Sequence, residues 1–217
     1  MRRTARSGPP SAVRRVYLDS FVRHVQQLFT KAFSAIDRRD LARSEETVVT
    51  GRLVDAMRTV ISAADAPAWA SRLAVHEDRP LSGGPAEGKR RPRIDIEIER
   101  VERGPRPCFQ IESKRLHRAD SVAEYVGVEG LGAFLDGTYA SGHTRAGMLG
   151  YVQTDTITSW VDKIRAKLSA ARKTQSIAGT PDALCHLVDD WYASTHDRAG
   201  DPIEILHGFL MCHDDTT

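Results

Sequence analysis

The chain has 217 residues, of which 41% are hydrophobic and 28% are charged. This length and composition suit one globular domain with a substantial core, and no apolar run approaches the roughly 18 residues of a membrane span. The formal net charge of +2 excludes binding to nucleic acid through overall charge, so any basic surface must be local.

The cysteines and the first residues bear on the compartment. Cys108, Cys185 and Cys212 are far apart and odd in number, a pattern without a disulfide framework or zinc spacing. A reducing, cytoplasmic location is the simpler expectation. Residues 1–10 are basic and are not followed by a continuous apolar segment, so we expect a disordered arm and no secretory signal.

Two helices are predicted before the first strand. Residues 11–40 form a helical extension, because their apolar residues recur at spacings of three and four. A second helix is predicted to begin near Ser44, which can cap it, with Glu45 and Glu46 in its first turn. The apolar stripe of this second helix is Val49, Leu53, Met57, Val60 and Ala64.

Either acidic residue of the first turn can serve as a favourable charge at a helix N-terminus. With about 100° of rotation per residue, Glu46 lies near the centre of the apolar stripe and Glu45 lies well to its side. An acidic residue in line with a buried face is a candidate for a site, and Glu46 is therefore the preferred helix carboxylate. Glu45 remains an alternative.

Residues 93–114 show the clearest pattern in the chain. In the first run, Ile94, Ile96 and Ile98 alternate with Asp95, Glu97 and Glu99. In the second run, Phe109, Ile111 and Ser113 alternate with Gln110, Glu112 and Lys114. This period of two predicts two half-buried strands, which follow a Gly/Pro-rich basic loop at residues 79–92 that is either a solvated connector or a phosphate contact.

A hairpin turn at Arg103-Gly104 would pair these strands in one register. Ile96 then faces Ile111 and Ile98 faces Phe109. On the other face, Asp95 lies opposite Glu112, with Cβ atoms roughly 5 Å apart. A slip by one residue would mix the apolar and polar faces, so this register is the one we predict.

The remaining segments complete an α/β pattern. The expected elements are a Gly-containing helix over 121–135, a buried strand over 146–152, a helix over 156–171, a loop over 172–181, a helix over 181–194 and a last strand from 203. The order predicts a mixed central sheet with helices on both faces, in a single domain over 11–217.

The paired carboxylates have a chemical consequence. Two carboxylates about 5 Å apart repel by roughly 3 kcal/mol at an effective dielectric near 20, so a cation between them is favourable. Mg²⁺ prefers oxygen ligands and uses one or two carboxylates, and it supports phosphodiester hydrolysis. Lys114 follows Glu112 by two residues and projects from the same face, where it can orient or help deprotonate a water, or neutralise charge on a phosphate.

Asp95 followed by Glu112-Ser113-Lys114 on the neighbouring strand resembles the PD-(D/E)XK nuclease superfamily. The resemblance covers roughly residues 44–152 and implies a restriction-endonuclease-like αβββαβ core. It also implies that Asp95, Glu112 and Glu46 bind Mg²⁺ or Mn²⁺ and that Lys114 supports the attacking water. One departure is that Ile94, and not the proline that names the motif, precedes Asp95; Pro92 lies three residues before it.

Residues 125–150 are similar to small bacterial nuclease-like proteins that are often found near phage-defence or restriction genes. Together the resemblances imply a metal-dependent deoxyribonuclease of a defence or restriction system, with DNA as substrate and a helicase, ATPase or other defence subunit as partner. Arg115, Arg118 and Arg145 are candidates for contacts to the nucleic-acid backbone.

Several alternatives remain open. The fold can bind nucleic acid or a partner protein without cutting, or act as an interaction subunit through its N-terminal helices. The acidic face of the hairpin can be a solvated surface, and Glu97 and Glu99 can bind metal or water. His117 and His143 can contact phosphate, although single histidines near loops are commonly surface groups. The pattern does not separate DNA from RNA.

Overall fold

The computed structural model describes residues 11–81, 88–102, 106–171, 174–178, 191–198 and 201–213. The predicted arm over 1–10, the predicted turn at Arg103-Gly104 and Cys185 lie outside the described residues. The α-helices are α1 (Ser11–Ser34), α2 (Glu46–Ser62), α3 (Ser121–Val126), α4 (Leu131–Leu135) and α5 (Ile157–Ser169). Short 3-10 helices are η1 (Leu41–Arg43), η2 (Ala70–Arg72) and η3 (Gly88–Arg90).

Within the described ranges, seven strands form one open mixed sheet, so the predicted α/β class with a mixed sheet is confirmed. The strands are β1 (Leu73–Pro80), β2 (Arg93–Arg100), β3 (Cys108–Leu116), β4 (Arg145–Val152), β5 (Thr174–Ala178), β6 (Tyr192–His196) and β7 (Ile203–Met211). Their spatial order is β1-β2-β3-β4-β7-β6-β5. The pairs β3–β4 and β4–β7 are parallel, and all other neighbours are antiparallel.

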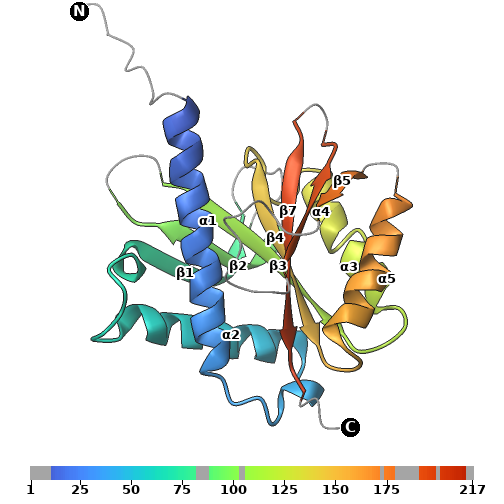
Figure 1. The fold of residues 1–217 in the computed structure, drawn as a ribbon, viewed down its shortest axis with the longest axis horizontal. Helices are drawn as coiled ribbons and strands as arrows, with labels where there is room; N and C mark the ends of the chain where they lie inside the picture. Colours follow the sequence, from blue (N-terminus) through green and yellow to red (C-terminus); the bar gives the residue numbers. More distant parts are fainter. Residues whose placement is uncertain are drawn as a thin grey trace, which may run out of the picture.

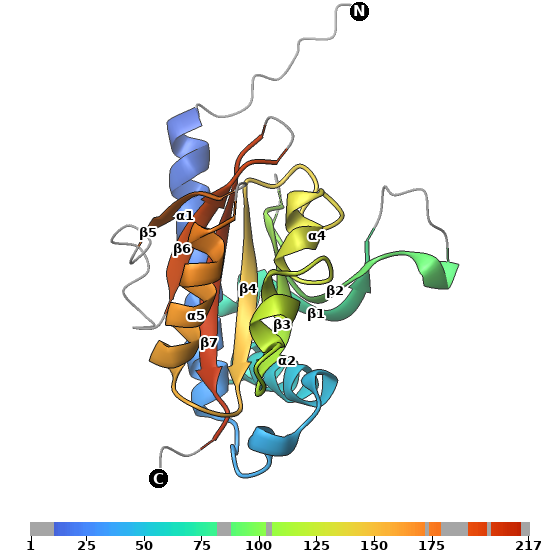
Figure 2. The same cartoon turned by 90° about the vertical axis from the view of Figure 1, so that its right-hand side faces the viewer.

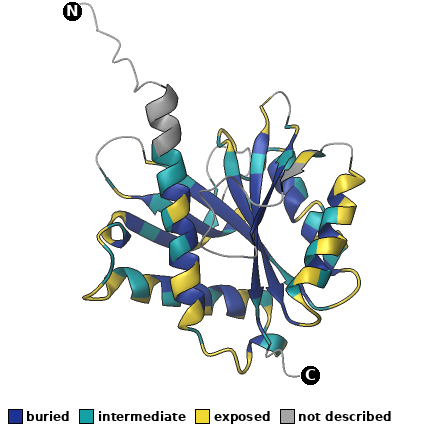
Figure 3. Ribbon diagram, in the orientation of Figure 1, coloured by how far each residue is buried: buried dark blue, intermediate teal, exposed yellow. Residues whose placement is uncertain are grey.

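Helices cover both faces of the sheet. In Figures 1 and 2, α1 and α2 lie on one side and α3, α4 and α5 lie on the other. The buried apolar residues accordingly form two clusters, one beneath α1 and α2 and one beneath α3, α4 and α5. The central strands are almost entirely buried (Figure 3), as expected for parallel strands that are covered on both faces.

The predicted hairpin register is confirmed for its apolar pairs, whereas the predicted pair Asp95–Glu112 lies just past the end of the ladder. Ile96 pairs with Ile111 and Ile98 with Phe109, and all four side chains are buried against α1 and α2. The opposite face is not a solvated surface, because Glu97 is 6% exposed and Glu112 is 4% exposed. The interpretation of the acidic face as an ordinary solvent-facing surface is therefore wrong for these two residues.

The predicted helix starts and breaks need two corrections. Ser44 does not cap α2: the cap position is Glu45, and the Ser44 hydroxyl instead donates to the carbonyl of Asp40. The helix predicted over 121–135 is divided into α3 and α4 by a turn. A Cβ on Gly132 would lie 2.6 Å from the carbonyl oxygen of Gly127, so the glycines of this turn allow close backbone packing.

The sheet has more strands than the pattern predicts. Strand β1 was not predicted from the sequence, because its polar residues and Pro80 hide the alternation. Strand β5 lies within the predicted loop over 172–181, where pairing with β6 gives this segment its strand conformation. Residues 192–194, predicted as the end of a helix, begin β6; the rest of that predicted helix lies largely outside the described residues.

In the part of the chain that the structure describes, no helix combines the length and the apolar character needed to cross a membrane.

A glycine pair tests the packing of the sheet. A Cβ on Gly208, in β7, would overlap the buried indole ring of Trp191, so we expect Gly208→Ala to lower the free energy of unfolding by about 1–3 kcal/mol through overpacking. Gly51→Ala is the matched control. It lies inside α2, where alanine is favoured by up to about 1 kcal/mol, and its Cβ meets only the flexible end of Glu77. Urea unfolding of both variants gives the comparison; equal stabilities would contradict this packing.

Candidate active site

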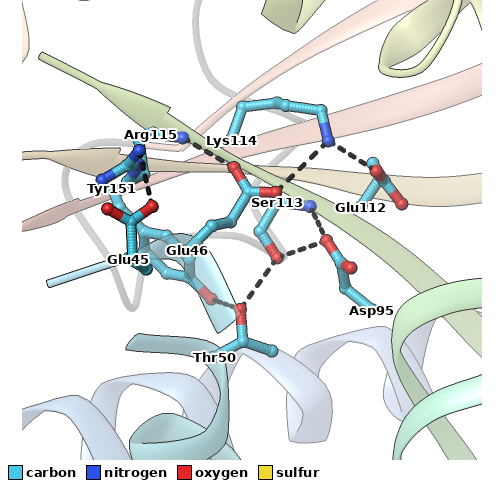
Figure 4. A network of polar contacts seen from close by, with 9 residues as sticks. All are labelled: Glu45, Glu46, Thr50, Asp95, Glu112, Ser113, Lys114, Arg115 and Tyr151. Atoms are coloured by element: carbon cyan, nitrogen blue, oxygen red, sulfur yellow. Dashed lines mark hydrogen bonds and ion pairs between the residues drawn. The ribbon is translucent and has the colours of Figure 1, made fainter. Parts of the chain in front are cut away.

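The site forms where β2 and β3 separate. Their ladder ends at the pair Ile96–Ile111, one residue before Asp95 would face Glu112. Asp95 fills the gap: its Oδ2 accepts hydrogen bonds from the backbone N–H of Ser113 at 2.7 Å and from the Ser113 hydroxyl at 2.9 Å (Figure 4). In a continuing ladder, a backbone carbonyl would accept a strand N–H of this kind. Here the side-chain carboxylate of Asp95 accepts it instead.

Strand β1 bends at the same level. Asp78 has a positive φ of 46° and is missing from the β1–β2 register, in which it would face Asp95. The two strands that flank β2, namely β1 and β3, therefore both depart from regular pairing with β2 beside the site. Aspartate tolerates the left-handed conformation better than most residues.

Helix α2 brings Glu46 to the same place. Its Oε2 accepts the backbone N–H of Arg115 at 3.0 Å, and its Oε1 lies 3.4 Å from the ammonium of Lys114. Glu45 turns outward instead and pairs with the guanidinium of Arg115 at 2.8 Å. The side chain of Glu45 is 72% exposed and that of Glu46 is 29% exposed, so Glu46 is the helix carboxylate at the site.

Lys114 joins the acidic groups from both sides. Its Nζ donates to Oε1 of Glu112 at 2.7 Å and to Oε1 of Glu46 at 3.4 Å. The four residues predicted from the sequence, Asp95, Glu112, Lys114 and Glu46, are therefore brought together. Figure 4 shows them converging from α2, β2 and β3.

The hydroxyl groups of Thr50, Ser113 and Tyr151 lie next to one another beside the carboxylates. Thr50, one turn after Glu46 in α2, lies 3.5 Å from the Ser113 hydroxyl and 2.8 Å from that of Tyr151 in β4. Burial raises the pKa of Tyr151, so its hydroxyl stays neutral. The sequence analysis missed Thr50 and Tyr151; the spacing of four between Glu46 and Thr50 is the signal that could have identified Thr50.

Glu112 is the most perturbed carboxyl group of the site. Burial, followed by the negative charge of Asp95, raises its pKa from the ordinary 4.5 to about 8, although Lys114 opposes the shift. Its Oε2 is buried and has no hydrogen-bond partner among the described residues. A buried carboxylate oxygen without a donor is costly, and such groups are common at functional sites.

The partners of Glu112 shift as well. Burial raises the pKa of Glu46, and the charge of Asp95 adds to this effect, whereas Lys114 opposes it. For Lys114, burial alone would lower the pKa, but the charges of Glu112 and Glu46 outweigh burial and the pKa rises. The ammonium therefore stays charged at neutral pH.

The carboxylate oxygens of the site are ligands of the kind that a hard divalent cation binds, although the side chains are not arranged around a single ion position. Among the described residues, no group of three or more His, Cys, Asp or Glu side chains is arranged to hold a metal ion as it stands. The buried Oε2 of Glu112 is nonetheless an open oxygen ligand, and both hydrogen bonds that Asp95 accepts go to its Oδ2. Such oxygen ligands suit Mg²⁺ or Mn²⁺.

The three predicted backbone-binding arginines do not form one surface. Arg115 lies beside the site, where it contacts Glu45 and the carbonyl of Ser44. Arg118 follows β3 and is about half exposed. Arg145 starts β4, at the end of that strand remote from Lys114, and forms ion pairs with Asp19 and Glu204 that hold α1 and β7 to it.

Glu97 and Glu99, which share the acidic face, have protein partners. Glu97 accepts hydrogen bonds from Arg79 at 2.5 Å and from the Gln110 amide at 2.8 Å. Glu99 pairs with His76 at 2.9 Å. These contacts explain how the two acidic groups are accommodated without a metal ion.

Neither a family model, nor a curated protein, nor a solved structure gives a significant match to this chain. The motif and the geometry of the site therefore carry the functional proposal.

The raised pKa of Glu112 makes stability depend on pH. The folded state keeps a proton on Glu112 up to pH about 8, whereas the unfolded chain releases it near 4.5. Because the folded state binds the extra proton, we expect stability to fall as pH rises through this window, by up to about 1.4 kcal/mol per pH unit for one proton. Measured by urea unfolding in EDTA, Glu112→Gln should show a weaker fall. Parallel pH profiles for the two proteins would contradict the assignment.

Proposed function

We propose that this chain is a Mg²⁺- or Mn²⁺-dependent nuclease that hydrolyses phosphodiester bonds in DNA. The observation that carries the proposal is the convergence of Asp95, Glu112 and Lys114 with Glu46 around a buried carboxylate oxygen that has no donor among the described residues. DNA is the substrate that the PD-(D/E)XK resemblance implies, and the similarity of residues 125–150 suggests phage defence or restriction as the setting.

The order of elements supports a restriction-endonuclease-like core. Helix α2 is followed by the antiparallel strands β1, β2 and β3, then by α3 and α4, and then by β4, which runs parallel to β3. This is the αβββαβ order that the resemblance implies. The carboxylates and Lys114 sit on the second and third of these strands, and Glu46 sits on the first helix.

Each group of the chain has a distinct role in this proposal. Asp95 and Glu112, with Glu46 beside them, would hold the metal ion. The hydrogen bond from Ser113 orients the Asp95 carboxylate, and the one from Arg115 orients the Glu46 carboxylate. The ion would polarise the phosphoryl oxygen and lower the pKa of a coordinated water. Lys114, charged and 2.7 Å from Glu112, neutralises negative charge that develops on the phosphate.

One observation favours a second candidate function. The ammonium of Lys114 already bridges Glu46 and Glu112, so these carboxylates have a cation without a metal ion. The same fold could then bind nucleic acid or a partner protein without cutting. Salt-sensitive DNA binding without metal-dependent turnover would distinguish this function from the nuclease.

Cleavage of DNA with Mg²⁺ or Mn²⁺, compared with EDTA, tests the nuclease. We expect Asp95→Asn and Glu112→Gln to lower the rate at least about 100-fold, the upper end of the cost of losing support around a metal. Lys114→Ala should lower it comparably, because charge stabilisation is lost. Thermal unfolding checks that each variant folds, and metal-dependent cleavage at the wild-type rate by the Glu112 and Lys114 variants would overturn the site.

Two adjacent glutamates provide a matched pair. Glu46→Gln removes a carboxylate that faces the site, and we expect it to lower the cleavage rate about 10-fold or more. Glu45→Gln removes an exposed surface ion pair with Arg115, a contact worth at most about 1 kcal/mol, so cleavage should stay within a few-fold of the wild-type rate. The reverse order of effects would assign the helix carboxylate to Glu45.

A further inference from the structure

A hollow of about 270 Å³ lies beside the candidate active site. We call it the Glu97 pocket. The lining residues used below are Arg79, Leu81, Glu97, Gln110, Ser141 and His143. It is bordered by β1, β2 and β3 and by the segment that connects α4 to β4, seen beside α4 in Figure 2.

The pocket and the carboxylate site are neighbours on the same two strands. Glu97 follows Asp95 by two residues in β2, and Gln110 precedes Glu112 by two residues in β3. Two residues of a strand span about 6.6 Å, so the pocket begins one strand repeat from the carboxylates. Tyr139, next to the lining residue Ala140, is within reach of the carboxylate charges: burial, then the charges of Glu112 and Asp95, raises the pKa of its hydroxyl.

The polar groups of the pocket are held in fixed positions. Glu97 is fixed by Arg79 and by the amide of Gln110, and the other end of that amide accepts the backbone N–H of Ala140 at 2.7 Å. Arg198 donates to the carbonyls of Ala140 and His143 at 2.9 and 2.7 Å, which anchors the connecting segment. Ligand sites are typically preformed in this way, with a few fixed polar groups in a concave surface.

The chemistry of the lining indicates what the pocket can receive. Four of its lining residues, Arg79, Glu97, Gln110 and His143, have planar polar side-chain groups, and Leu81 adds an aliphatic side chain. Proteins read unpaired bases with such planar hydrogen-bonding groups and with apolar or guanidinium surfaces for stacking. Its volume is just below the roughly 300 Å³ at which pockets for drug-sized ligands begin, which suits one base and not a base pair.

We propose that the Glu97 pocket binds the base of a nucleotide adjacent to the scissile phosphate, and that the substrate is therefore single-stranded or unpaired at that nucleotide. This inference rests on the proposed nuclease function, because a phosphate at the carboxylate site places the next nucleoside about one strand repeat away. A base inside a duplex is stacked and paired, so it must be unstacked before it can enter the pocket.

An abasic scan tests the proposal directly. Short single-stranded DNA that carries one abasic residue, moved stepwise along the strand, is assayed for binding in EDTA and for cleavage in Mg²⁺. We expect one position, adjacent to the cut, at which loss of the base weakens binding and slows cleavage about tenfold, a typical cost for losing one bound base. A fully paired duplex should be bound and cut more weakly than the single strand.

Variants connect that effect to the pocket. Ser141 is exposed and lines the hollow, so Ser141→Phe should fill it and make binding insensitive to the abasic position. Ser71→Phe makes the same change at an exposed serine in η2, which precedes β1 at the end of that strand remote from the pocket. This variant should keep the full tenfold effect of the abasic residue. If Ser141→Phe does not fold, His143→Ala, which removes a ring from the lining, serves for the same comparison.

The outcomes separate the pocket from the nuclease. An abasic effect on binding that Ser141→Phe removes, without metal-dependent cleavage, would support the pocket and reject the proposed function. Metal-dependent cleavage with a flat abasic scan, or with wild-type behaviour of the pocket variants, would keep the nuclease and overturn the pocket. Neither binding nor cleavage would overturn both.

Discussion

The separation of β2 from β3 beyond Ile96–Ile111 is the constraint on which the rest of the site depends. A regular ladder would bring the strands together at this point and leave no room for charged groups between them. Instead, Asp95 satisfies the N–H of Ser113 with its carboxylate, so the strands can part without an unpaired buried donor. The gap admits Glu46 from α2, and the antiparallel pair Ile96–Ile111, directly before the gap, fixes the backbone next to Glu112.

The charges in this gap are not explained as a device for stability. A buried ion pair such as Glu112–Lys114 gains little over apolar packing, because removing both charges from water is costly. Glu46 and Glu112 share one ammonium here, the charge of Asp95 acts on the same groups, and one buried oxygen of Glu112 has no donor among the described residues. When these carboxyl groups ionise, their mutual repulsion lowers the stability of the metal-free fold and raises its affinity for a cation, since a cation relieves the repulsion.

The sequence was sufficient for the register and for the members of the site, but not for their surroundings. Ile96 and Ile98 share one buried face, so alternation selects the pairing of Ile96 with Ile111. Ile94, which the alternation places on the same face, instead belongs to the cluster on the other side of the sheet. Alternation could not show that Glu97 and Glu112 are buried, or that the segment after α4 contacts this face through the Gln110 amide, which accepts the backbone N–H of Ala140. Strand β5 was missed for a similar reason: its pairing with β6 gives it a strand conformation.

The same alternation connects the carboxylate site to the Glu97 pocket. Because successive residues of a strand are separated by a fixed rise, Asp95 lies two residues from Glu97 in β2, and Glu112 lies two residues from Gln110 in β3. The ladder pairs Glu97 with Gln110, and the carboxylate site lies just past the end of this ladder at Ile96–Ile111. Chemistry and recognition are then positioned by one rigid pair of strands rather than by separate loops. A rigid spacing of this kind limits the substrates that fit both places at once, and a chain with a base free to leave its stack meets that limit more easily than a duplex does.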